Sequence, residues 1–134
     1  LLSRYEPGMT SAVHSDAAFL PPPTGPMRSG VSATLFIGDP ATYDGGELRI
    51  HLGSETVTIK GNPGEMIIYP SNTLHEVVPV TRGERLAFFT FMESVIPDHV
   101  QRELLYTLNE VYALEGLQLD WPTRTRLPPP SACS

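Results

Sequence analysis

Two histidines and one aspartate carry the most distinctive chemistry in this sequence. His14 and Asp16 are separated by a single residue, and His75 opens the apolar segment 75–80 after a polar loop. Residues two apart in a strand project from the same face, so His14 and Asp16 can approach one ion together. With His75 as third ligand they would form the two-histidine, one-carboxylate set of ferrous oxygenases, although zinc with a water molecule accepts the same ligands.

Arg85 makes this pattern more specific. It lies ten residues after His75 and begins the aromatic segment 85–93. Strand alternation puts Arg85 on the same face as Ala87 and Phe89, which predicts that its side chain points inward. A buried guanidinium needs an anionic partner, and the distal carboxylate of 2-oxoglutarate can accept two parallel hydrogen bonds from it. A structural carboxylate, or exposure at the rim, is the alternative.

Strands must position these residues, and the pattern of the sequence predicts them. Apolar and polar residues alternate in 31–37, 47–52 and 56–60, whereas 65–69 is a continuous apolar run expected to be buried on both faces. Eight or so short strands separated by turn residues predict a mainly β fold. We expect a jelly roll, in which two sheets face each other across a pocket.

Three turns are predicted between these strands. Asp44-Gly45-Gly46 has glycines that reach positive φ, and Asn62-Pro63-Gly64 has the residues of a type II turn. The segment 81–84 predicts a hairpin, which would place the strand of His75 beside the strand of Arg85 in one sheet.

One helix is predicted near residues 97–114. Its apolar residues fall on one stripe at helical spacing: Val100, Leu104, Leu108 and Val111. We therefore expect a β core over 1–95, a helix over 96–116 packed on that core, and a disordered tail over 117–134. The proline-rich segment 19–30 directly follows His14 and Asp16, so we expect it to form part of a substrate entrance.

The composition excludes several classes of function. The 134 residues suit one domain, and a net charge of −6 gives no basic footprint for nucleic acid or an anionic membrane. No apolar run approaches the roughly 20 residues of a membrane span. The single cysteine, Cys133, and the lack of a signal-peptide pattern fit a reducing cytoplasm.

Several motifs, in order, resemble the catalytic core of the prolyl-4-hydroxylase-like dioxygenases, and within that group the bacterial PKHD-type hydroxylases. The motifs are RYEPGM at 4–9, HSD at 14–16, SATLF at 32–36, YDGGEL at 43–48, YPS at 69–71, LH at 74–75 and TRGER at 81–85. The likeness covers about residues 3–108. Members of the family have more chain before this core and after the helix, so we expect this chain to be a fragment that contains the catalytic core.

The resemblance implies a double-stranded β-helix with Fe(II) held by His14, Asp16 and His75. It implies that Arg85 binds 2-oxoglutarate, that Tyr5 lies near this co-substrate, and that L-ascorbate keeps the iron ferrous. The expected reaction is hydroxylation of an unidentified substrate by O₂, with release of succinate and CO₂. For Tyr5, a core tyrosine with a hydrated hydroxyl is the alternative.

Two other interpretations remain open from the sequence. One is a cupin-like metal-binding protein or isomerase without a keto-acid co-substrate, and the other is a non-enzymatic remnant that keeps the motif. The remaining histidines, His51 and His99, are expected to be solvated. His51 shares a polar strand face with Glu47 and Arg49, and His99 lies in the first turn of the predicted helix.

Overall fold

The computed structural model describes residues 1–20 and 27–115, which fall into two compact units. The first, here called the β unit, is Leu1–Ser94, and the second begins at Val95. The predicted tail at 117–134 lies outside the described residues.

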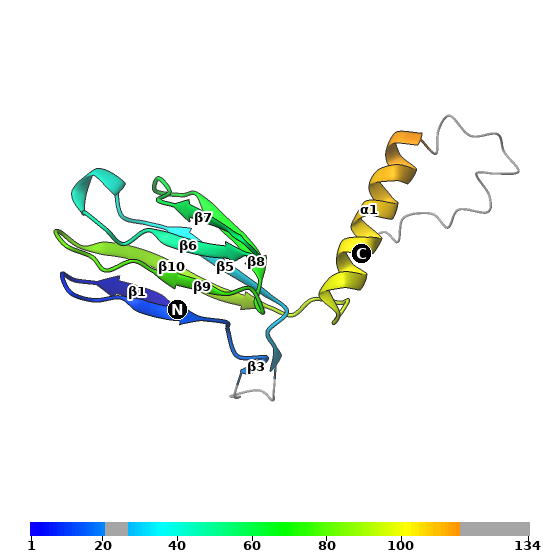
Figure 1. Ribbon diagram of the computed structural model, residues 1–134, viewed down its shortest axis with the longest axis horizontal. Coiled ribbons are helices and arrows are strands. Elements are labelled where there is room, and N and C mark those ends of the chain that lie inside the picture. The colour runs from blue at the N-terminus through cyan, green and yellow to red at the C-terminus, as the bar shows by residue number, and fades with distance from the viewer. Residues whose placement is uncertain (21–26, 116–134) are drawn as a thin grey trace, which may run out of the picture. The chain divides into compact units, whose positions relative to one another are not determined.

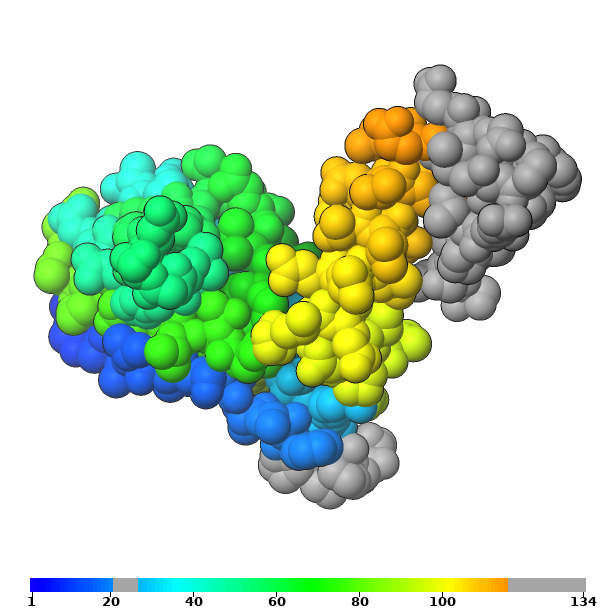
Figure 2. Space-filling model, turned by 45° about the vertical axis from the view of Figure 1, so that its right-hand side comes forward, coloured from blue at the N-terminus to red at the C-terminus, as the bar shows by residue number. Residues whose placement is uncertain are grey.

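The β unit is a sandwich of two four-stranded antiparallel sheets (Figure 1). The first sheet contains, in spatial order, β1 (Leu2–Tyr5), β10 (Arg85–Met92), β5 (Val31–Phe36) and β8 (Met66–Pro70). The second contains β2 (Ser11–His14), β9 (His75–Val77), β6 (Leu48–Leu52) and β7 (Glu55–Ile59). Figure 2 shows the blue N-terminal segment lying directly against green segments from later in the chain. This architecture confirms the predicted jelly roll.

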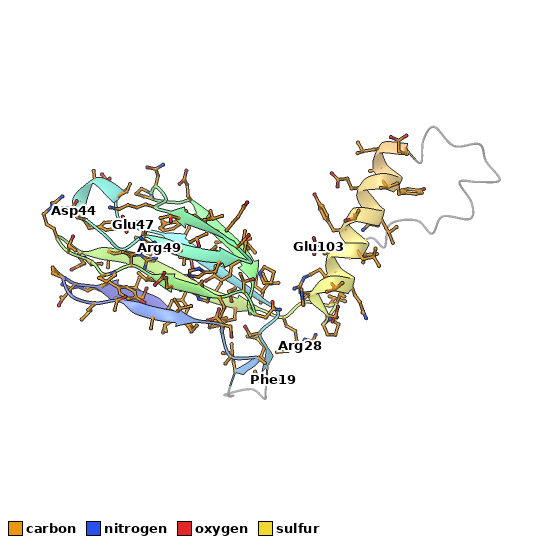
Figure 3. All side chains as sticks on the ribbon, in the orientation of Figure 1. Phe19, Arg28, Asp44, Glu47, Arg49 and Glu103 are labelled. Carbon is orange, nitrogen blue, oxygen red and sulfur yellow. The ribbon has the colours of Figure 1, made fainter. Side chains whose placement is uncertain are left out.

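Two short strands and a 3₁₀ turn complete the β unit. The strands β3 (Phe19–Leu20) and β4 (Met27–Arg28) pair with each other, and a 3₁₀ turn, η1, spans Pro40–Thr42. Phe19 lies opposite Arg28 in this small hairpin (Figure 3). Residues 21–26 of the proline-rich segment lie outside the described part of the chain.

Alternating residues from both sheets form the core. Phe36 and Tyr69 come from the first sheet, whereas Leu48 and Ile50 come from the second, and all four are buried in one cluster. The intervening residue Arg49 is exposed, as the period-two pattern predicts for a strand with one face on the core.

The prediction that the apolar run 65–69 is buried on both faces is wrong. This run forms β8, which is an edge strand of the first sheet, and Met66 and Ile68 are exposed while Tyr69 is buried. An edge strand of a two-layer sandwich has only one neighbour and only one face toward the core, so continuous hydrophobicity did not indicate double burial here.

The strands of His75 and Arg85 do not form a hairpin, contrary to the prediction. Strand β9 lies in the second sheet and β10 in the first, so the connection between them crosses the sandwich. Arg82 pairs instead with Asp44, which belongs to the crossing connection between β5 and β6. As a result, His75 and Arg85 belong to facing sheets.

The turn at Asn62-Pro63-Gly64 is confirmed as type II. Gly64 has φ +91°, and the Glu65 amide donates to the Asn62 carbonyl at 3.0 Å. This turn also crosses from one sheet to the other, because it joins β7 to β8.

The second unit contains the helix α1 (His99–Glu115), within the predicted region. Asp98 is its N-cap, because its carboxylate accepts from the Gln101 amide at 2.9 Å. The packing of this helix on the β unit stays a prediction. No helix of the described residues is long and apolar enough to cross a membrane.

Gly83 in the crossing connection should tolerate no side chain. It has φ +73°, and a Cβ there would lie 2.1 Å from the Thr42 carbonyl oxygen. Gly53 in the β6–β7 turn has φ +64° with open space around it. We expect Gly53→Ala to lose about 1 kcal/mol of unfolding free energy for its left-handed backbone.

Gly83→Ala should lose clearly more than Gly53→Ala, because the backbone must also move. Urea denaturation of both variants measures the difference. Equal losses would contradict the tight approach of this connection to the β5–β6 loop.

Candidate metal centre

A cavity of about 140 Å³ lies between the two sheets of the β unit. All five residues that the sequence singled out line it: Tyr5, His14, Asp16, His75 and Arg85. The two histidines come from the second sheet, whereas Tyr5 and Arg85 come from the first. A void near 150 Å³ can hold a molecule the size of benzene, so this one suits a small ligand.

The two histidines are cross-strand neighbours. His14 and His75 pair between β2 and β9, and their ring centroids are 4.4 Å apart. The Nδ1 atom of His14 lies 2.7 Å from the Ala12 carbonyl oxygen, and that of His75 lies 3.0 Å from the Thr73 carbonyl oxygen. A carbonyl can only accept, so each Nδ1 carries the proton, and Nε2 is the nitrogen that has the lone pair in the neutral ring.

Asp16 reaches the same point from outside regular structure. Strand β2 ends at His14, so the predicted i, i+2 strand geometry does not apply to Asp16. Its backbone amide donates to the Ser71 carbonyl at 3.0 Å, which fixes the chain after the strand. Its Oδ1 atom lies 3.8 Å from both histidine Nε2 atoms, while Oδ2 accepts from Ser32 Oγ at 2.5 Å.

This donor set fits a divalent metal ion. His14, Asp16 and His75 offer two imidazole nitrogens and a carboxylate oxygen, all within 4.8 Å of one another. The His75 side chain is 7% exposed and Asp16 is 12% exposed, whereas His14 is 44% exposed. The group is therefore open to solvent on the His14 side, and the three residues leave other positions around an ion free.

Arg85 is buried without a counter-ion. It is 2% exposed, forms no ion pair with another described residue, and its Nε atom has no hydrogen-bond partner among them. Its guanidinium carbon lies 5.3 Å from the ring centre of Tyr5 and 5.8 Å from that of Phe36. Burial lowers the pKa of Arg85 from its ordinary value, although the nearby Tyr43, Tyr5 and Tyr69 act in the opposite direction.

Arg85 and Tyr5 lie beside each other on the wall of the cavity. Arg85 is neither at the rim nor paired with a carboxylate of the described residues, so its guanidinium is available to a ligand in the cavity. Tyr5 stands opposite Arg85 in the β1–β10 register and is partly buried. Its ring therefore flanks the guanidinium and is not part of the hydrophobic core cluster.

Sequence reasoning missed Tyr69 and Ser32. The Tyr69 ring lies 4.9 Å from that of His75, and burial raises the pKa of its phenol, with the charge of Asp16 acting in the same direction. Ser32 bonds to the Asp16 carboxylate. One face of segment 31–37 carries Ser32 and Thr34, and this pattern could have indicated Ser32. Hydroxyl groups that face a protein core need hydrogen-bond partners inside it.

His51 lies outside the cavity but is not as solvated as expected, because its side chain is 29% exposed and its Nε2 atom is buried without a hydrogen-bond partner among the described residues. It projects from the outer side of the second sheet, where its Nε2 atom is 3.5 Å from the Glu76 carboxylate. Arg49, labelled in Figure 3, also lies near Glu76, at 3.8 Å. His99 is the first residue of α1.

Comparison with known proteins identifies relatives of the whole β unit. Residues 1–93 match the family model described as the 2OG-Fe(II) oxygenase superfamily. A PKHD-type hydroxylase from Sphingopyxis alaskensis is 54% identical over 127 residues, which cover 95% of this chain and 58% of the relative. A PKHD-type hydroxylase from Teredinibacter turnerae is 42% identical over 107 residues, covering 79% of this chain and 47% of the relative.

A solved structure shows the same likeness. A prolyl-4-hydroxylase from Pseudomonas putida has a TM-score of 0.56 and 28% identity, covering 70% of this chain and 51% of that one. The sequence-based resemblance is therefore confirmed. The chain spans about half the length of the relatives that it matches.

The buried charge of Arg85 should destabilise the chain when no ligand is present. Replacing an uncompensated buried ion by an apolar side chain of similar length removes its desolvation cost. We expect Arg85→Met to raise the free energy of unfolding by about 1 kcal/mol or more in ligand-free protein. Arg49→Met, at an exposed pair, should leave it nearly unchanged.

Chemical denaturation of the two variants beside the unmodified chain measures this effect. A marked loss of stability in Arg85→Met would contradict it, because that result would mean that the folded chain already stabilises the guanidinium.

Proposed function

Because the chain belongs to the 2OG-Fe(II) oxygenase superfamily, we propose that it is the catalytic core of a dioxygenase that hydroxylates a substrate with Fe(II), 2-oxoglutarate and O₂. Succinate and CO₂ would be the other products. One observation carries the proposal: a two-histidine, one-carboxylate group and an unpaired buried arginine share a single cavity.

His14, Asp16 and His75 would hold the iron. Their tautomers and orientation suit this role, because both Nδ1 atoms donate to carbonyls and leave Nε2 directed at Asp16 Oδ1. When bound, Fe(II) supplies the activation of O₂, and that chemistry belongs to the metal. The contribution of the protein is to fix three ligands on one side and leave the others open.

Arg85 would bind the distal carboxylate of 2-oxoglutarate. The guanidinium offers parallel donors that match a carboxylate, and its burial strengthens such a bond. Charge supports a dianion here, since a divalent cation with Asp16 and Arg85 leaves a site that is positive overall. Tyr5, which flanks Arg85, would donate a hydrogen bond from its phenol to the same ligand.

Apolar side chains would limit the access of water to the part of the cavity away from His14. Ala87, Phe89 and Phe91 line the cavity from β10, and Leu48 and Val77 line it from the second sheet. Water excluded by such side chains cannot screen the charges of the ligands or react in place of the substrate.

Further parts of the proposal concern the protein as a whole. L-Ascorbate would keep the iron ferrous, and the setting would be cytoplasmic. The β3–β4 hairpin would border the substrate entrance, because it begins three residues after Asp16 and carries the exposed Phe19 (Figure 3).

The cupin-like alternative gives no role to Arg85. A metal site without a keto acid needs no buried cation, yet Arg85 is 2% exposed and lines the metal cavity. This observation favours the dioxygenase over a metal-dependent isomerase.

Metal binding should stabilise the chain through the two histidines of the cavity. At a metal concentration of one hundred times Kd, the gain is about 2.7 kcal/mol, which a thermal melt with Co(II) or Mn(II) would detect. His75→Ala should abolish this shift, whereas His51→Ala, on the outer sheet face, should keep it. A metal-free melt of each variant serves as the control for folding, and loss of the shift in both variants would contradict the site.

Co-substrate binding should depend on Arg85 separately from the metal. Arg85→Met should keep Co(II) binding and weaken 2-oxoglutarate binding by about tenfold or more, because a charge-assisted pair contributes about 1.5–3 kcal/mol. Calorimetric titration of the metal-loaded protein with 2-oxoglutarate measures this effect. The Fe(II)-loaded chain should also release succinate slowly without added substrate.

The matched control is Arg49→Met, which should bind the keto acid as the unmodified chain does. A metal-loaded, folded chain that binds no 2-oxoglutarate would support the cupin-like alternative, and a chain that binds neither would support the remnant.

A further inference from the structure

A row of three buried serine hydroxyl groups ends on the carboxylate of Asp16. Ser29 Oγ lies 2.9 Å from Ser71 Oγ, which lies 2.8 Å from Ser32 Oγ. Ser32 Oγ in turn lies 2.5 Å from Asp16 Oδ2. The three serines are only 2–7% exposed, so their hydroxyl groups depend on one another for hydrogen bonds.

The chemistry of the groups fixes the direction of every bond in this row. An ionised carboxylate can only accept, so Ser32 must donate its one proton to Asp16. Ser32 can then only accept from Ser71, and Ser71, having used its own proton, can only accept from Ser29. The donors therefore run from Ser29 through Ser71 and Ser32 to Asp16, and each bond polarises the next.

The row also ties the carboxylate to the opposite sheet. Ser32 belongs to β5 and Ser71 directly follows β8, and both strands lie in the first sheet. The two histidines belong to the second sheet. Asp16 thus receives its side-chain bond from one layer and faces imidazoles held by the other.

Backbone contacts already anchor the chain at this point. The Asp16 amide donates to the Ser71 carbonyl, and the Ser29 amide donates to the Ala18 carbonyl at 2.9 Å. The hydroxyl row is therefore not needed to close the loop. The row acts instead on the rotation of the Asp16 carboxylate. The bond from Ser32 holds Oδ2, which leaves Oδ1 facing the histidines.

We infer that Ser32 is a positioning residue that sets the orientation of Asp16 for metal binding, and that Ser71 and Ser29 orient Ser32 in turn. This inference rests on the proposed role of Asp16 as a metal ligand. Groups of this kind hold a ligand in the geometry that the ion needs, and their loss lowers metal affinity without removing a ligand.

The Ser32→Ala variant tests the inference. Its affinity for Co(II) is measured by calorimetric titration, and the geometry around the bound ion is monitored by its visible absorption. We expect Co(II) binding about 10–100-fold weaker than in the unmodified chain and an altered absorption spectrum, because the carboxylate is free to turn. Ser71→Ala should weaken binding less, and Ser29→Ala least, since each change lies one hydroxyl further from Asp16.

Matched variants separate positioning from a general loss of structure. Ser3→Ala removes a hydroxyl that lines the same cavity but donates to the Ala87 carbonyl at 3.1 Å, and it should leave Co(II) affinity unchanged. Ser32→Thr keeps the hydroxyl and should restore most of the affinity. If Ser32→Ala does not fold, Ser71→Ala supplies the test, because it leaves the bond between Ser32 and Asp16 in place.

The possible outcomes are distinct. Unchanged affinity and spectrum in Ser32→Ala, or in Ser71→Ala where that variant replaces it, would overturn the inference and leave the proposed function standing. Weakening by Ser3→Ala equal to that by Ser32→Ala would also overturn it, because the effect would not be specific to the row. An unmodified chain that binds no Co(II) would refute the proposed function, and the inference with it.

Discussion

The pairing of β2 with β9 is the constraint on which the site depends. Its register sets His14 directly opposite His75, and backbone carbonyls two residues earlier hold both rings by Nδ1. A shift of that register by one residue would send every following side chain to the other face of the sheet. Val77 of β9 is buried opposite Leu48 of β6, so a slip of β9 would move an apolar side chain out of the core.

The connection from β9 to β10 crosses between the sheets and so determines the position of Arg85. Because β9 and β10 lie in different sheets, Arg85 faces the cavity from the layer opposite to the histidines. A ligand between the layers can then meet a metal on one side and a guanidinium on the other. Gly83 permits the close approach of this connection to the β5–β6 loop.

The buried polar groups of the sandwich differ in whether they have partners. Near Asp16, the hydroxyl groups of Ser29, Ser32 and Ser71 satisfy one another and one carboxylate oxygen. Arg85, by contrast, has no counter-ion among the described residues. A satisfied network makes its members rigid, whereas an unpaired buried charge gains most from a ligand of opposite sign. Under the proposed function, the metal ligands would already be held in position before the metal binds, whereas Arg85 would gain its counter-ion only when the co-substrate binds.

The sequence by itself determined the fold class, the positions of most strands from residue 31 onward, and five of the residues that line the cavity: Tyr5, His14, Asp16, His75 and Arg85. Alternation and turn chemistry are local properties, so they could be detected without knowing which strands pair. Only the tertiary structure decided that the strands of His75 and Arg85 face each other and are not neighbours, and that β8 lies at a sheet edge. It also decided that Ser32 bonds to Asp16, sixteen residues away. These features depend on pairing between distant segments and on the layer that each strand joins, which short-range patterns do not specify.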